Sequence, residues 1–218
     1  MAESRIIKRN VRFWGKSGLQ LTGMMLIFMV VYGFLFNMGS SRVFGDFWKT
    51  AYFYGGIISV LFAMIGPVSY VGSYLPLTLS FGSGRREAVF GAQIFCVVYV
   101  VSAYIILVFA GIMSNGKLNA LIAVLFIFMT AIGQLVSVAQ MHFGMKGMII
   151  GIVMVVLGIV IGIVAGIGFI DQIMAWINRI QTNVVWTLLA IAAIVSIALY
   201  AVSVMALFRE MRHYEVKA

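Results

Sequence analysis

Six long stretches without a charged residue constrain the fold of this chain more than any other feature of its sequence. Asp, Glu, Lys and Arg are absent from residues 17–41, 50–84, 88–116, 118–145, 147–170 and 180–208. Each stretch is longer than the ~20 residues that a helix needs to cross the ~30 Å hydrocarbon core of a bilayer. The sequence predicts six membrane-spanning helices, at Leu19–Met38, Ala51–Val71, Val89–Ile112, Leu118–Val138, Met148–Phe169 and Val184–Leu207.

The composition excludes water-soluble classes of protein. Apolar residues make up 63% of the 218 residues and charged residues only 10%, whereas a soluble domain has about 45–50% and about 25%. So few charges cannot cover the surface of a soluble enzyme or a nucleic-acid-binding module. The apolar runs are also continuous, whereas a barrel strand alternates over ~10 residues. We therefore expect an all-α integral membrane protein, a single six-helix domain over residues 1–218 that binds no nucleic acid.

The positions of Lys and Arg predict the orientation of the chain. Eleven of the fifteen fall in the N-terminal segment, the 72–88 loop, the 139–147 loop and the C-terminal tail, which lie on one side of the predicted membrane. Four fall on the other side. Because cytoplasmic loops carry the excess of Lys and Arg, the sequence predicts a multi-pass protein of the cell (cytoplasmic) membrane with both termini in the cytoplasm.

The predicted spans contain no acidic or basic residue. Asp, Glu, Lys, Arg and His are absent from all six, although proton-coupled carriers usually need an ionisable relay within the membrane. Cys96 is the only cysteine, so it cannot form an internal disulfide, and we interpret it as a small buried apolar residue. We expect no catalytic residue, no metal site and no cofactor in this chain.

The uncharged polar residues of the spans allow two interpretations. Gln93 lies in the third predicted span, and Thr130 and Gln134 lie in the fourth. Such side chains form interhelical hydrogen bonds, worth about 0.6 kcal/mol per pair, or they line a path for a substrate. We favour hydrogen bonding and keep the substrate path as the alternative.

Glycines recur at helical spacing around the fifth predicted span. Gly147 and Gly151 are four residues apart, and so are Gly158, Gly162 and Gly166. Residues at this spacing share a helix face, and small residues on such a face let two helices approach closely. The glycine face serves packing within the chain or a dimer contact with a second copy, and the sequence leaves both open.

Two amphipathic segments flank the spans. In residues 4–17, Ile7, Val11 and Trp14 fall on one face and basic residues occupy the rest. This pattern predicts an N-terminal amphipathic helix that lies on the inner leaflet, with Trp14 near the lipid headgroups. Residues 170–183 carry an apolar stripe as well and predict an outer interfacial segment, which is either a gate or a plain connection.

Residues 75–91, LPLTLSFGSGRREAVFG, join an apolar run to a charged cluster in a loop. Pro76 suits the first turn of a helix, and a Gly-Ser-Gly sequence then interrupts the chain. If Gly84 caps the following helix, Glu87 occupies its third position, where a carboxylate favours the helix dipole. A short apolar helix beside water is typical of a docking element for another protein, and a helix among the headgroups is the alternative.

This loop resembles the permease subunits of ATP-binding cassette exporters, in the small type-two class with six spans. The matching residues are Leu79-Ser80-Phe81-Gly82-Ser83-Gly84-Arg85-Arg86-Glu87. The six-span layout, the N-terminal amphipathic helix, the segment before the last span and the basic tail extend the resemblance over the whole chain. Gly84 departs from the family pattern, in which other residues are common at this position.

The resemblance implies a coupling helix over residues 75–84 that inserts into a groove of a separate ATPase subunit. The docking residues that it implies are Leu77, Leu79, Phe81 and Gly82, with Arg85, Arg86 and Glu87 at the membrane-side edge. It also implies a pair of permeases, identical or related, assembled with two ATPase subunits. ATP and Mg²⁺ are expected on the ATPase, because this chain has no G-x-x-x-x-G-K-[ST] phosphate loop.

The resemblance and the uncharged spans together predict a non-enzymatic permease subunit of an ATP-driven exporter. Its expected cargo is apolar or amphipathic: a hydrophobic peptide, a lipid-like compound or a drug. The alternative is a non-transporting membrane scaffold or sensor partner that docks a cytoplasmic protein through residues 75–91. A passive channel is disfavoured, because neither a ring of charges nor a polar spine is visible in the sequence.

Overall fold

The computed structural model describes residues 2–37, 43–70, 75–80, 84–110, 116–147, 149–151, 153–154, 156–157, 160 and 182–213. Across these ranges the regular structure is helical throughout. The helices are α1 (Ala2–Asn37), α2 (Val43–Ser69), α3 (Leu75–Ser80), α4 (Arg85–Ala110), α5 (Gly116–Phe143) and α8 (Thr182–His213).

By length and composition, five helices of the described chain are able to cross a membrane. The segments that qualify are Val11–Leu35, Thr50–Ser69, Arg85–Ala110, Gly116–Phe143 and Asn183–Arg212. They correspond to the first four predicted spans and to the last. Most of the fifth, Met148–Phe169, lies outside the described residues, and its described residues, which end at Val160, are helical. The segment predicted at 170–183 also lies outside, except for its last two residues, which begin α8.

α1 differs from the prediction of a separate interfacial helix at residues 4–17. The helix runs without interruption from Ala2 to Asn37, so the basic amphipathic segment forms its first turns. Across the expected boundary, the Ser17 hydroxyl donates to the carbonyl of Phe13 (3.1 Å). The sequence permits this continuity, because α1 contains no proline that would remove a backbone donor.

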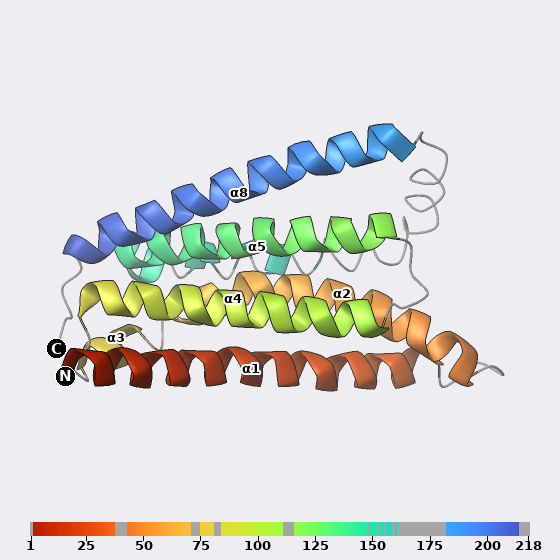
Figure 1. Cartoon of the computed structure of the whole chain (residues 1–218), viewed down its shortest axis with the longest axis horizontal. Coiled ribbons are helices and arrows are strands. Elements are labelled where there is room, and N and C mark those ends of the chain that lie inside the picture. The colour runs from red at the N-terminus through yellow and green to blue at the C-terminus, as the bar shows by residue number, and fades with distance from the viewer. Residues whose placement is uncertain are drawn as a thin grey trace.

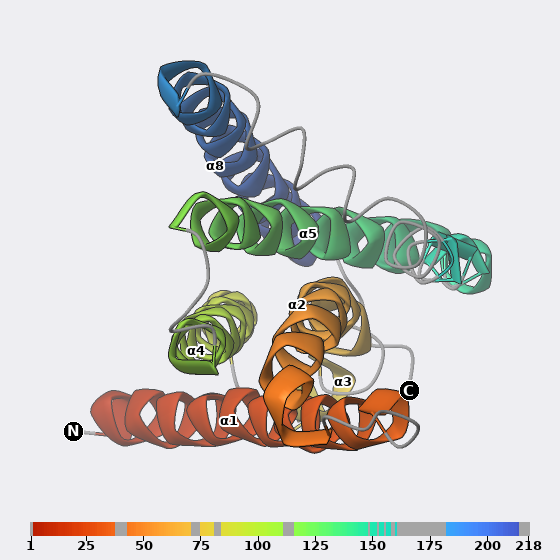
Figure 2. The same ribbon diagram turned by 90° about the vertical axis from the view of Figure 1, so that its right-hand side faces the viewer.

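The helices form successive layers. α2 and α4 lie side by side between α1 and α5, and α8 covers the outer side of α5 (Figures 1 and 2). α1 begins and α8 ends at one end of the bundle, which also holds α3 and the start of α4 (Figure 1). α5 and α8 begin at the opposite end. The loop with the permease-like motif therefore lies at the same end as both termini of the described chain.

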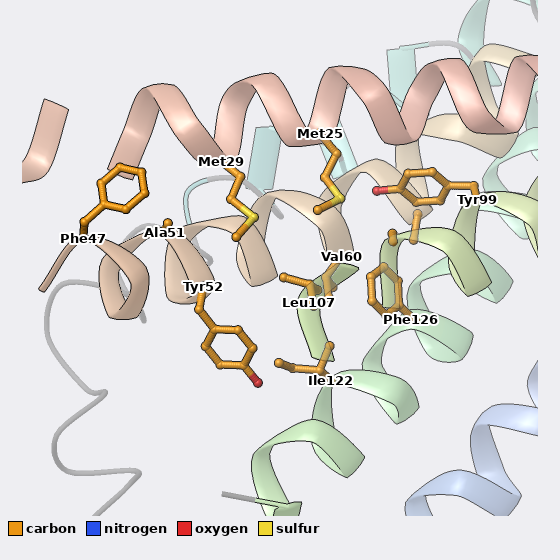
Figure 3. Packing of buried hydrophobic residues seen from close by; sticks show 12 residues of the cluster. Met25, Met29, Phe47, Ala51, Tyr52, Val60, Tyr99, Leu107, Ile122 and Phe126 are labelled. Atoms are coloured by element: carbon orange, nitrogen blue, oxygen red, sulfur yellow. The ribbon is translucent and has the colours of Figure 1, made fainter. Parts of the chain in front are cut away.

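The main apolar core lies between α1, α2, α4 and α5. Met25 and Met29 point into it from α1, and Phe126 enters it from α5 (Figure 3). A Cβ atom at Gly133 of α5 would overlap the carbonyl of Met64 in α2, so these two backbones approach as closely as glycine permits. In a bilayer, where lipid tails are as apolar as these side chains, close packing rather than exclusion of water would hold such a core together.

Candidate functional site

The predicted coupling helix is present in part as α3. Leu75 is fully buried, Thr78 is 8% exposed, and the Thr78 hydroxyl donates to the Leu75 carbonyl (2.9 Å). Leu79 is partly buried against the same apolar cluster. These three residues, at spacings of three and four, form the face of α3 that packs on the bundle. Leu79, implied as a docking residue, is thus partly engaged in anchoring α3.

Other docking residues that the resemblance implies for this loop cannot be placed in the structure. Phe81 and Gly82 lie outside the described residues, and so does the side chain of Leu77. The part of the candidate site that the structure describes therefore consists of α3 and the start of α4.

Leu75 belongs to an apolar cluster that joins α3 to three long helices. Its neighbours in the cluster include Trp14 of α1, Ala88 of α4 and Met211 of α8. The Trp14 ring lies 4.5 Å from the ring of Tyr70, measured between centroids, and the Tyr70 hydroxyl donates to the Ala88 carbonyl. Trp14, expected among the headgroups, is instead 1% exposed inside this cluster. The corner between α3 and α4 is thus fixed to α1 and α8.

The start of α4 confirms the predicted cap. α4 begins at Arg85, and the backbone N–H of Gly84 donates to Glu87 Oε2 (3.1 Å). The N–H of Ala88 donates to the Gly84 carbonyl (3.0 Å), which is the first hydrogen bond of the helix. A glutamate at the third position that returns to the capping residue is half of a capping box. Glu87 is thereby held against the first turn of α4.

The two arginines of the motif meet the end of α8. Arg85 Nη1 donates to the backbone carbonyl of Arg212 (2.6 Å). Arg85, Arg86 and Arg212 are exposed and line a cavity of about 650 Å³ together with Phe90, Phe208 and Met211. The structure thus gathers three cations around one partly apolar hollow between α4 and α8.

Gln93 and Gln134, two of the three residues suggested for a substrate path, are hydrogen-bonded to each other. Gln134 Nε2 donates to Gln93 Oε1 (2.9 Å). From α8, the Ser203 hydroxyl donates to Gln134 Oε1 (2.9 Å), and the Tyr200 hydroxyl donates to Gln93 Oε1. These contacts join α4, α5 and α8, as the interhelical interpretation predicts.

Thr130, the third residue of that suggestion, lies beside an apolar pocket. Its hydroxyl donates to the Phe126 carbonyl of its own helix (2.7 Å). The pocket has a volume of about 240 Å³ and also has walls from α4 and α8, among them Val97, Val101 and Ile197. The hydroxyl is satisfied locally, so the pocket offers apolar surface rather than hydrogen-bonding groups.

The described part of the glycine pattern packs within the chain. α5 ends at Phe143, and Gly144 turns the chain with a φ of +58°. A Cβ atom at Gly151 would lie 2.9 Å from Val136 Cγ1 of α5, and one at Gly147 would overlap the same helix. The three later glycines of the pattern, Gly158, Gly162 and Gly166, lie outside the described residues. Close packing on α5 therefore accounts for the first two glycines.

One polar contact near the end of the bundle that holds α3 has no clear signal in the sequence. His142 Nδ1 lies 2.9 Å from Glu210 Oε1 and joins the end of α5 to the end of α8. The only sequence signal is that both residues lie in predicted cytoplasmic segments, which does not specify a pair.

The described residues contain no group of three or more His, Cys, Asp and Glu that could hold a metal ion. Comparison with known proteins yields no match: neither a family model, a curated protein nor a solved structure matches this chain. The fold by itself defines an all-helical protein whose long apolar helices are compatible with a membrane.

Proposed function

We propose that this chain is the transmembrane permease subunit of an ATP-driven exporter of the ATP-binding cassette class. It lies in the cell membrane with both termini in the cytoplasm. Two copies of a separate ATPase, which bind ATP and Mg²⁺, dock beneath it, and a second permease, identical or related, completes the complex. The resemblance of residues 79–87 to the permease motif and the position of this loop beside both termini support the proposal.

The observation that carries the proposal is the anchoring of α3. A helix of six residues is too short to be stable in isolation. Leu75 holds α3 in one cluster with Trp14 of α1 and Met211 of α8. Force applied to α3 is therefore transmitted to α1, α4 and α8 together. Such a mechanical link is what a coupling element between an ATPase and a helical bundle requires.

Transport follows as a shift between two populations. The ATP-bound and the nucleotide-free ATPase make different contacts with the loop at residues 75–87, and this difference favours one arrangement of the permease pair over the other. ATP binding displaces α3, and the helices anchored to it tilt. The path for the cargo opens outward between the two permeases.

The cargo is apolar or amphipathic, a class that includes hydrophobic peptides, lipid-like compounds and drugs. The Gln93–Gln134 pair forms hydrogen bonds between helices, which account for Gln134, whereas Gln93 Nε2 is buried without a hydrogen-bond partner among the described residues. Thr130 instead lies on the wall of an apolar pocket. The surfaces that this chain offers to a cargo are therefore mainly hydrocarbon.

Co-purification from native membranes tests the proposal. A tagged chain is expected to retain a protein that has a phosphate loop and no spans of its own. The Phe81→Ala variant is expected to lose this protein at least tenfold. Phe109→Ala is the matched control, because Phe109 is 69% exposed near the far end of α4, and it is expected to retain the ATPase.

Two results would contradict the proposal. One is a stable chain that retains no ATPase although it elutes as a single species. The other is undiminished ATPase binding by Phe81→Ala. Retention of a different cytoplasmic protein, lost in the same variant, would point instead to a scaffold or sensor partner.

A further inference from the structure

We propose that the groove between α4 and α8 binds an anionic phospholipid. Its phosphate lies at Arg85, Arg86 and Arg212, and one acyl chain reaches the apolar pocket nearer the middle of the bundle. The inference rests on the membrane location in the proposed function, but it needs neither the ATPase nor transport.

Within the described residues, the charges at the head of this cavity have no carboxylate counterion. No carboxylate of the described chain forms an ion pair with Arg85, Arg86 or Arg212. The two acidic residues nearest to them in sequence are already engaged, since Glu87 accepts from a backbone N–H and Glu210 contacts a histidine. Guanidinium groups bind phosphate through paired hydrogen bonds. A cavity of about 650 Å³ between them leaves room for such a group.

The same cavity has an apolar side that a free anion would not use. Phe90 and Phe208 form an edge-to-face pair with centroids 5.7 Å apart, and Met211 lies beside them. Basic pockets between helices on the cytoplasmic side of a membrane are typical sites for anionic lipid headgroups. The combination of arginines and aromatic walls therefore favours a phospholipid over inorganic phosphate.

A second, mainly apolar pocket lies farther along α4 and α8, nearer the middle of the bundle. It is formed by Val97 and Val101 of α4 and Ile197 of α8, among others. Phe90, Val97 and Val101 are 59%, 52% and 50% exposed and make one stripe along α4. The seven residues from Phe90 to Val97 correspond to a rise of ~10 Å. This distance fits within one leaflet, whose hydrocarbon is ~15 Å deep.

Lipid binding by the purified chain tests the inference. The chain in detergent is titrated with phosphatidylglycerol or with phosphatidylcholine, and the bound lipid is measured by native mass spectrometry. We expect tighter binding of phosphatidylglycerol. In the double variant Arg86→Gln/Arg212→Gln its affinity is expected to fall by about 30-fold, since each arginine near a membrane surface contributes about 1 kcal/mol. The Arg212 carbonyl that accepts from Arg85 is kept in this variant.

The matched control removes two charges from the same end of the bundle without touching the cavity. Lys146→Gln/Arg209→Gln is expected to bind phosphatidylglycerol as the parent chain does, because neither residue lines the cavity. Equal binding of the two lipids, equal losses in the two double variants, or displacement of the lipid by inorganic phosphate would each overturn the inference. A chain that binds the lipid selectively but captures no ATPase would support this site and contradict the proposed transporter.

Discussion

Trp14 is the largest fully buried side chain of the described chain, and it depends on a glycine. A Cβ atom at Gly91 of α4 would overlap the indole ring. The absence of a side chain at Gly91 therefore allows α1 and α4 to approach at the level of the α3–α4 corner. One residue thus sets the packing of the cluster on which the coupling proposal depends.

Gly91→Ala is expected to destabilise the protein because the added methyl group displaces Trp14. Over-packing of this kind costs about 1–3 kcal/mol. Gly23→Ala is the control, since a Cβ atom at Gly23 would meet nothing within 4 Å and the change in helix propensity is the same. The free energy of unfolding in mixed micelles should be about 1–3 kcal/mol lower for Gly91→Ala than for Gly23→Ala. Equal values for the two variants would contradict the packing described here.

The hydrogen bond between Ser203 and Gln134 is expected to be measurable as a coupling energy. A double-mutant cycle of Gln134→Leu and Ser203→Ala should give about 0.6 kcal/mol, the average for membrane helices, and no more than about 1.7 kcal/mol. Ser196→Ala replaces Ser203→Ala in the control cycle, because the Ser196 hydroxyl donates to the Ala192 carbonyl of its own helix. The control cycle should give zero. A coupling energy near zero in both cycles would contradict the hydrogen bond between Ser203 and Gln134.

At the scale of the elements, α1 is the helix that the sequence predicts least well. The stripe formed by Ile7, Val11 and Trp14 has the same spacing in a helix that lies on a membrane and in the first turns of a helix that crosses it. Periodicity reports which residues share a face, but not whether the helix continues. For this reason the sequence did not reveal that α1 is continuous, and the break expected after residue 17 is absent from the structure.

Ser17→Pro distinguishes the continuous helix from two separate ones. In the continuous helix the proline removes a backbone hydrogen bond to Phe13 and clashes with the preceding turn, at a cost of about 3 kcal/mol. Ala2→Pro is the control, because the first residue of a helix tolerates proline. The free energy of unfolding should fall for Ser17→Pro alone. If both variants unfold as the parent does, residues 4–17 form a separate helix.

Other elements follow from the sequence because a long apolar segment that enters a bilayer has few backbone conformations open to it. A segment that crosses a bilayer must satisfy its own hydrogen bonds, so the gaps between charges predict the long helices. The Gly84 cap follows from local chemistry in the same way. The Gln93–Gln134 pair could not be predicted, because the rotation of α4 relative to α5 depends on packing over the whole interface. The burial of Trp14 could not be predicted for the same reason, since it also depends on how the helices pack against one another.

The arrangement of the whole molecule makes a prediction about membrane sides. Gly116 begins α5 and Asn183 lies in the first turn of α8, and both helices begin at the same end of the bundle (Figure 1). Met145 follows α5 at the opposite end and is 77% exposed. In the proposed orientation, Gly116 and Asn183 face the outside and Met145 faces the cytoplasm.

Single-cysteine variants in a Cys96→Ala background test this orientation. In intact cells, a membrane-impermeant thiol reagent should label Gly116→Cys and Asn183→Cys and leave Met145→Cys unlabelled. Permeabilised cells are the control, in which all three should react. None of these substitutions removes a Lys or Arg, so the charges that set the orientation are unchanged. Labelling of Met145→Cys in intact cells would reverse the proposed sides.

The most direct test of the coupling proposal is crosslinking from position 81 in living cells. A photoactivatable thiol reagent on Phe81→Cys, in the Cys96→Ala background, should form one major adduct, with a phosphate-loop ATPase, and ATP depletion should change its yield. Phe109→Cys should form none. Reaction of Phe81→Cys from outside the cell, or the lack of any adduct with an ATPase, would contradict the account.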